Sequence, residues 1–156
     1  MADASVRPST EAELRRIKPF MKLMSKANTW VFRASGGRLG AKFRGGASVG
    51  LLTTTGRKSG AERTTPLIYL ADGERIALVA SQGGMPRNPL WYDNLSAQPE
   101  VAFQTPKGKR RYRAHIANSS EKAALWPRLV AIYPDYAEYQ KRTEREIPVV
   151  VLEPTS

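Results

Sequence analysis

The sequence predicts a mainly β fold of the α+β class, in which about six antiparallel strands, with short helices between them, form a small barrel or a strongly curled sheet. Three observations support this prediction. From Ser48 onward, short β-branched and apolar runs alternate with turn residues. Few connections between these runs are long enough for the crossovers that parallel strands require. The length of 156 residues is also typical of a single core.

The first 46 residues differ in character from the rest. Thr10 and Glu13 form a capping box, and apolar side chains then recur at helical spacing over residues 20–31. Residues 1–46 carry ten Lys or Arg and three Asp or Glu, so this segment holds +7 of the net charge of +11. We therefore expect a tail and a basic amphipathic helix over residues 1–46, followed by the barrel domain over residues 47–156.

The first three strands of the barrel domain are expected over residues 49–55, 64–70 and 75–81. The first strand is β-branched and apolar and ends at the bend formed by residues 56–60. Pro66 places the second strand at a sheet edge or a bulge, because proline cannot donate to a central ladder. Residues 71–74 form a hairpin turn. The third strand contains a run, residues 76–80, that is apolar enough to be buried on both faces.

Helix-capping signals locate the elements that follow. Asn88 is a typical N-cap, and Pro89 after it suits the first helical position. Asn118 with Glu121 forms a second capping box. The predicted elements are, in chain order, a short helix over 88–96, strands over 100–105 and 109–117, a helix over 118–132, a further helical turn or two from Pro134, and a last strand over 147–152.

The composition narrows the possible chemistry. The chain has no cysteine, which excludes disulfides, iron–sulfur clusters and thiolate zinc sites. Its single histidine, His115, argues against a histidine metal site or a Ser-His-Asp triad and is expected to be structural or at the surface. We expect no metal. Any catalysis must come from tyrosines, serines, backbone groups or a bound cofactor.

The basic charge favours an acidic ligand, an anionic membrane or nucleic acid. The basic hairpin over residues 107–113 lacks interleaved aromatic residues apart from Tyr112, so we expect no nucleic-acid partner. No apolar run reaches the roughly 20 residues that span a membrane, and the first residues lack a secretory signal, which predicts a cytoplasmic protein. The lysine-bordered apolar stripe of the N-terminal helix either packs on the barrel or contacts the inner face of the cell membrane peripherally.

Two glycine-rich turns are the most informative features of the chain. Residues 56–60 (Gly-Arg-Lys-Ser-Gly) follow the first strand, and residues 81–84 (Ser-Gln-Gly-Gly) follow the third. Glycine permits positive φ and close approach to the backbone, and exposed amides in such turns form an anion-binding concavity. The pattern predicts a site for a planar ligand that bears a phosphate. An ordinary solvated hairpin turn and a flexible loop are the alternative interpretations.

Aromatic residues near these turns suggest contacts with a flat ligand. Trp91 begins the short helix after the second turn and either anchors the core or covers one face of a ligand. Tyr133, Tyr136 and Tyr139 recur every three residues and therefore share one helix face. Three phenols suit a pocket for a carbonyl or nitro compound, and simple packing is the alternative.

Several blocks of the chain, in their order, are similar to the deazaflavin-dependent nitroreductases of actinobacteria. The likeness covers about residues 48–154. It implies a split β-barrel that binds reduced coenzyme F420, a deazaflavin with a phosphate and an acidic polyglutamate tail, and that transfers a hydride to a quinone, a nitroimidazole or a similar electron-poor acceptor. Membrane-borne menaquinone is one such acceptor. The blocks are Leu51–Gly60, Thr65–Leu67, Ala80–Gly84, Arg87–Leu95, Tyr133–Tyr136 and Ile147–Val150.

The resemblance also implies roles for individual residues. The coenzyme phosphate or tail would meet Arg57, Lys58 and Ser59. The ring would lie beside Pro66, Ile68, Val79 and Ser81, with Gln82, Gly83, Arg87, Trp91 and Asn94 near the coenzyme. The acceptor would bind at Tyr133, Tyr136 and Tyr139, with Tyr133, Tyr136 or Ser81 as the hydrogen-bonding catalytic groups. Relatives often carry lysine at the position of Gln82, and some carry an aromatic residue in place of Ile68.

Two other functions fit the same residues. An FMN-binding split barrel could use the bend at residues 56–60 for the flavin phosphate. A non-enzymatic protein could bind a membrane or nucleic acid through residues 15–44 and 107–113. The oligomeric state does not follow from the sequence.

Overall fold

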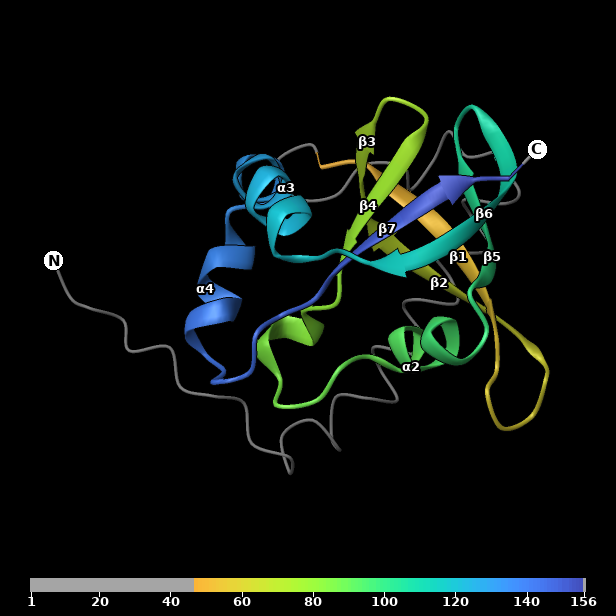
Figure 1. Ribbon diagram of the computed structural model, residues 1–156, viewed down its shortest axis with the longest axis horizontal. Helices are drawn as coiled ribbons and strands as arrows, with labels where there is room; N and C mark the ends of the chain where they lie inside the picture. Colours follow the sequence, from red (N-terminus) through yellow and green to blue (C-terminus); the bar gives the residue numbers. More distant parts are fainter. Residues whose placement is uncertain (1–46, 156) are drawn as a thin grey trace, which may run out of the picture.

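The computed structural model describes residues 47–155, so the tail and amphipathic helix expected over residues 1–46 lie outside the described part of the chain. Within it, seven strands form one antiparallel sheet in the order β2-β1-β5-β6-β7-β4-β3. Figure 1 shows that this sheet curls strongly, with α3 and α4 on one side and α2 near the hairpin of β1 and β2. The predicted antiparallel, curled architecture is confirmed, with seven strands in place of about six.

The elements have the following bounds. The strands are β1 (Val49–Thr55), β2 (Glu62–Ile68), β3 (Leu70–Asp72), β4 (Arg75–Val79), β5 (Glu100–Thr105), β6 (Gly108–Ile116) and β7 (Val149–Pro154). The helices are the short 3-10 turn η2 (Gln82–Gly84), α2 (Leu90–Ala97), α3 (Ser119–Ile132) and α4 (Asp135–Lys141). None of the helices described between residues 47 and 155 combines the length and the apolar character needed to cross a membrane.

The additional strand arises because the expected second strand is divided at Tyr69. β2 ends at Ile68 and forms one edge of the sheet, as Pro66 indicated, whereas β3 begins at Leu70 and forms the opposite edge. A single residue thus joins the two edges, which requires the sheet to curl until they meet. Tyr69 bonds through its backbone N–H to the carbonyl of Ser48 (3.1 Å), and its ring packs edge-on against Phe103, with ring centroids 5.2 Å apart.

Two hydrophobic clusters lie on the two faces of the central strands. In β4, Leu78 belongs to the cluster that also contains Trp91 and Phe103, whereas Val79 belongs to the cluster beneath α3 and α4. β7 alternates in the same way. The prediction that residues 76–80 are buried on both faces is therefore confirmed, since all are at most 6% exposed.

Of the two predicted N-cap residues, one is confirmed and one is wrong. Asn118 caps α3 as expected, with Glu121 completing the capping box. The expectation that Asn88 caps α2 is wrong, because Pro89 occupies the N-cap position. The side-chain oxygen of Asn88 instead accepts a hydrogen bond from Arg145 (2.8 Å), a residue that lies after α4.

Ion pairs connect α3 to the edge of the sheet. Asp72 accepts hydrogen bonds from Arg75 (2.6 Å) and from Arg128 of α3 (2.8 Å), which lower the pKa of its carboxyl group. The ring of His115 lies 2.9 Å from a carboxylate oxygen of Glu121, and this hydrogen bond is the main reason that the pKa of Glu121 is also lowered. His115 therefore has a structural contact, as its sequence context suggested.

Candidate functional site

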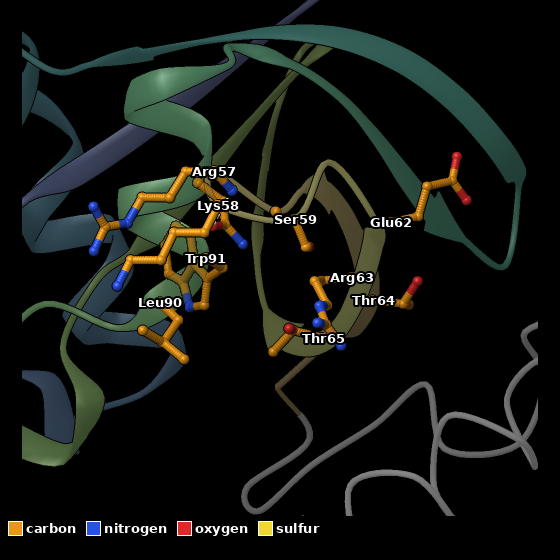
Figure 2. A pocket seen from close by; sticks show the side chains of 11 residues that line it. Arg57, Lys58, Ser59, Glu62, Arg63, Thr64, Thr65, Leu90 and Trp91 are labelled. Atoms are coloured by element: carbon orange, nitrogen blue, oxygen red, sulfur yellow. Dashed lines mark hydrogen bonds between the residues drawn. The ribbon is translucent and has the colours of Figure 1, made fainter.

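The bend between β1 and β2 and the first turn of α2 enclose a pocket of about 830 Å³. Figure 2 shows Arg57 and Lys58 extending in the same direction from the bend, on the side where Leu90 and Trp91 lie, whereas Glu62 is directed away from them. The pocket is lined by Gly56, Arg57, Lys58, Ser59, Glu62, Arg63, Thr64, Thr65, Leu90, Trp91 and Asn94.

The bend is a closed and well-bonded turn. The N–H of Gly56 donates to the carbonyl of Ala61 (2.7 Å), and the N–H of Gly60 donates to the carbonyl of Gly56 (2.8 Å). Gly60 has φ +72°, in the left-handed region that favours glycine. The Ser59 hydroxyl accepts from the N–H of Ala61 (3.2 Å), which leaves its own O–H available to donate.

Asn94 connects the bend to α2. Its side-chain oxygen accepts from the backbone N–H of Arg57 (3.2 Å), and its side-chain nitrogen donates to the hydroxyl of Thr54 at the end of β1 (3.2 Å). Asn94 and Thr54 are both buried. This residue, expected near a coenzyme, therefore also holds the bend against the helix that carries Trp91.

The pocket has a cationic side. Arg57, Lys58 and Arg63 are exposed. In the part of the chain that the structure describes, neither Arg57 nor Lys58 is paired with a carboxylate. Unpaired cations beside the flat, mostly buried ring of Trp91 suit a ligand that is planar at one end and anionic at the other. Arg63, Thr64, Thr65 and Leu90 were not among the predicted site residues, although the β1–β2 hairpin register places the strand after the bend beside it.

The second glycine turn follows β4 and leads into α2. Gln82, Gly83 and Gly84 all have positive φ (44°, 64° and 81°), which is unusual for a glutamine. The Gln82 side-chain amide faces two carbonyl oxygens, and the orientation that satisfies them has its nitrogen donating to Arg87 (3.0 Å) and to Asn88 (3.1 Å). The side chain of Gln82 therefore folds over the loop. Ser81 is 8% exposed, and its hydroxyl forms no hydrogen bond within residues 47–155.

The three tyrosines do not line the pocket beside the bend. Tyr133 and Tyr136 are buried in the cluster beneath α3 and α4, with ring centroids 4.9 Å apart, and the hydroxyl groups of Tyr133 and Tyr139 lie 3.2 Å apart. Burial is the main cause that raises the pKa of both Tyr133 and Tyr136. The sequence also led us to expect the cationic bend and the three phenols in one cleft, and this expectation is wrong for the described residues, because the pocket beside the bend includes none of the three tyrosines.

The other predicted contacts divide between the loop and the sheet. Arg87 is exposed on the loop that precedes α2. Pro66 pairs with Leu51 in the β1–β2 ladder, while Val79 belongs to the cluster beneath α3 and α4 and the partly buried Ile68 packs against it. None of these four side chains lines the pocket beside the bend.

Sequence reasoning missed Arg145. Its guanidinium group donates to the carbonyls of Ala80, Ser81 and Met85 and to the side chain of Asn88. Three of these acceptors are backbone carbonyls. Every residue has such a carbonyl, so no pattern of residue types could have predicted the contacts of Arg145.

Comparison with solved structures defines the class of protein. A structure described as an F420-H2 dependent reductase, FDR-A, superposes with a TM-score of 0.64 at 40% sequence identity, over 67% of this chain and 93% of that one. The curled sheet is thus the split barrel of F420-dependent reductases, and the predicted fold class is confirmed.

The chain belongs to the F420H(2)-dependent quinone reductase family, whose sequence profile matches residues 24–154. An F420H(2)-dependent quinone reductase of Mycobacterium tuberculosis H37Rv is 39% identical over 127 residues, covering 78% of this chain and 84% of the relative. Another protein of that strain, provisionally named for the same activity, is 44% identical over 117 residues, covering 75% of this chain and 98% of the relative. The resemblance to deazaflavin-dependent reductases is confirmed.

Proposed function

We propose that this protein oxidises reduced coenzyme F420 and reduces a quinone, with the coenzyme held in the pocket between the bend at residues 56–60 and α2. It is an oxidoreductase of the F420H(2)-dependent quinone reductase family. The single observation that carries the location is the pair Arg57 and Lys58, two cations without a carboxylate partner in residues 47–155 that extend beside Trp91. When bound, the reduced coenzyme supplies the hydride.

The residues of the bend fit the acidic end of this coenzyme. Arg57 offers a planar fork to a phosphate or carboxylate, and Lys58 offers a compact charge. The Ser59 O–H is free to donate, and Arg63 adds a further cation on β2. We assign the phosphate and tail to these side chains, because the chemistry of the donors matches the charge of the group.

The flat part of the coenzyme fits the other end of the pocket. Trp91 and Asn94 belong to the pocket lining, whereas Ser81, Gln82, Gly83 and Arg87 lie outside it, on the loop that precedes α2. The hydroxyl of Ser81 forms no hydrogen bond within residues 47–155, so it is available to a ligand at this loop. We therefore place the ring between α2 and the residues that follow β4.

The identity of the electron acceptor is a second and more specific part of the proposal. A tyrosine phenol is protonated at neutral pH, and burial raises the pKa of Tyr133 and Tyr136 further, so each is a hydrogen-bond donor. Both lie in the cluster beneath α3 and α4, outside the pocket beside the bend, so donation to an acceptor carbonyl requires that the acceptor bind next to that cluster. We propose menaquinone as the acceptor to test first and a nitroimidazole as the second. The surplus of +7 in residues 1–46 supports peripheral contact with an anionic membrane, where such a quinone resides.

The test is an anaerobic assay with the full-length protein, reduced F420 and menadione. We expect the absorbance of the oxidised coenzyme to return faster than in a control without protein. A rate equal to that control would contradict the proposed activity. Titration with F420 and, separately, with FMN then identifies the coenzyme, and preferential binding of FMN would overturn the assignment in favour of a flavin enzyme.

A further inference from the structure

Arg145 connects the two ends of the loop that joins β4 to α2. At the start of this loop, its Nη2 donates to the carbonyls of Ala80 (3.1 Å) and Ser81 (3.0 Å). In the middle of the loop, its Nε donates to the carbonyl of Met85 (2.8 Å), and near the end of the loop its Nη1 donates to the side chain of Asn88 (2.8 Å). Figure 1 shows the segment between α4 and β7 running beside this loop.

The loop needs such a support because one of its non-glycine residues, Gln82, has a backbone conformation that is unfavourable for a side chain. Gln82, Gly83 and Gly84 occupy the left-handed region in succession, and only two backbone hydrogen bonds, Gly84 N–H to Ser81 and Met85 N–H to Gln82, are formed within the turn. A positive φ at a non-glycine residue such as Gln82 persists only where surrounding groups hold it. The guanidinium of Arg145 supplies that support from outside the loop.

Arg145 is itself held in place by α4. The side-chain nitrogen of Gln140 donates to the carbonyl of Arg145 (2.8 Å), and the side-chain oxygen of Gln140 accepts from the N–H of Ile147 (3.0 Å). The backbone of α4 also approaches the loop closely, since a Cβ on Gly84 would lie 2.7 Å from the carbonyl oxygen of Tyr139. The helix, Arg145 and the loop therefore form one interlocked unit.

The chemistry of the contacts explains why the residue is an arginine. Arg145 is half-buried, and in residues 47–155 its side chain forms no ion pair with a carboxylate. A planar guanidinium keeps its charge in such surroundings and directs several N–H groups outward in fixed directions. A lysine ammonium, a compact group on a flexible stem, cannot reach the four acceptors of this loop at once.

We propose that Arg145 is a positioning residue for hydride transfer. Its guanidinium fixes residues 80–88, and thereby sets Ser81 and the Gln82–Gly84 backbone relative to the first turn of α2. This inference rests on the proposed function, in which the loop and α2 together contact the coenzyme. Arg145 acts through the loop and needs no contact with coenzyme or acceptor.

The test compares full-length Arg145→Lys, Arg145→Met and Asn88→Ala with the wild type. Asn88→Ala removes one of the acceptors without changing the charge and keeps the test informative if Arg145→Met fails to fold. Arg113→Lys and Arg113→Met serve as matched controls, because Arg113 is an exposed arginine on β6 that pairs with Glu100. The measurements are amide hydrogen exchange of residues 82–85, the affinity for reduced F420, and kcat and KM with menadione.

We expect faster exchange at Gly84 and Met85 in all three variants, with exchange in the central strands unchanged. We expect kcat/KM to fall by roughly a hundredfold in Arg145→Met, the scale for a misplaced reacting group, and to be poorly restored by lysine. The Arg113 variants should match the wild type. Wild-type exchange and wild-type kinetics in Arg145→Lys and Asn88→Ala would overturn the inference.

The outcomes separate this inference from the proposed function. If the wild type neither binds F420 nor reduces menadione, the proposed function fails, while the exchange data still decide whether Arg145 fixes the loop. If the wild type is active and the loop loosens without any change in kcat, KM or coenzyme affinity, the positioning role fails and the proposed function stands.

Discussion

The side-chain oxygen of Asn94 lies 3.2 Å from the backbone nitrogen of Arg57, so a residue of α2 directly holds the bend that carries Arg57 and Lys58, two of the cations that line the pocket. The other end of the same amide bonds to Thr54, at the end of β1. The cationic bend is therefore not an independent loop. Its position depends on the helix that also presents Trp91.

Replacing Asn94 with alanine should loosen the bend and destabilise the fold. The change leaves the N–H of Arg57 and the buried hydroxyl of Thr54 without partners, which costs about 1–3 kcal/mol. Denaturant unfolding measures this loss, and F420 titration should show weaker binding. Ser96→Ala on the exposed face of the same helix is the control. Unchanged stability and affinity in Asn94→Ala would show that the bend holds its position without this contact.

Lys58→Ala should weaken coenzyme binding by roughly threefold to tenfold, because an exposed charge contributes a modest attraction. The difference from the wild type should shrink at high salt, since added ions screen the interaction. Titration with F420 at two salt concentrations measures both effects. Lys107→Ala, in the turn between β5 and β6, changes the net charge equally and should bind like the wild type. Equal affinities for Lys58→Ala and the wild type would remove Lys58 from the site.

Tyr136→Phe should slow turnover with little change in coenzyme affinity, because the substitution removes one hydrogen-bond donor and keeps the ring. The same change should leave the fold intact, since the ring packs against Tyr133 and Tyr139. Steady-state kinetics with menadione and F420 titration separate the two effects. If the variant turns over at the wild-type rate, Tyr136 is a packing residue and the acceptor binds elsewhere.

Gly84→Ala should destabilise the protein by about 2–4 kcal/mol, which is the sum of the cost of a left-handed backbone at alanine and the cost of a steric clash. A Cβ at this position would lie 2.7 Å from the carbonyl oxygen of Tyr139 and 2.9 Å from the Cβ of Arg142. Gly73→Ala is the matched control, because Gly73 also has positive φ (61°) but open space around it. It should cost about 1–2 kcal/mol, for the backbone alone. Equal melting temperatures for the two variants would refute the clash.

Acid should weaken the attachment of α3 to the sheet. The pKa values of Glu121 and Asp72 are lowered in the folded protein, mainly by hydrogen bonds from His115 and Arg128 respectively. A depressed carboxyl pKa contributes stability that is present above the unfolded value and lost as the pH falls through the folded value. For Glu121 the loss should begin below its ordinary value of 4.5.

Unfolding free energies between neutral pH and the acid range measure this dependence. Glu121→Gln keeps a side chain that can complete the capping box but removes the charge, so its stability should vary less with pH. Glu144→Gln changes the charge at an exposed position and should follow the wild type. A Glu121→Gln curve parallel to that of the wild type would contradict the assignment.

Features set by neighbouring residues were predictable from the sequence. The β-branched run of β1 and the capping box of Asn118 and Glu121 depend on contacts a few residues apart, and both occur where expected. The family resemblance, rather than a local pattern, placed both the bend and Trp91 beside the coenzyme, and the two line one pocket.

Features set by distant contacts were not predictable. Asn88 has the chemistry of an N-cap, but Arg145 competes for its side chain, and nothing near Asn88 in the sequence reveals this. The tyrosines share a helix face as predicted, yet the curl of the sheet beneath α4, which a local pattern does not encode, decides that this face is buried. The division of the second strand at Tyr69 likewise follows from closure of the sheet.

Tyr69 has a mechanical consequence for the pocket. β2 contributes Arg63 and Thr65 to the pocket lining, while β3 contributes Asp72, which Arg128 binds from α3. Only one residue joins these two strands, so the connection cannot lengthen. A displacement of β2 that widens the pocket would therefore also displace β3 and strain the ion pair between Asp72 and Arg128. We therefore expect a ligand bound in the pocket to restrain β3 and, through the Asp72–Arg128 ion pair, α3.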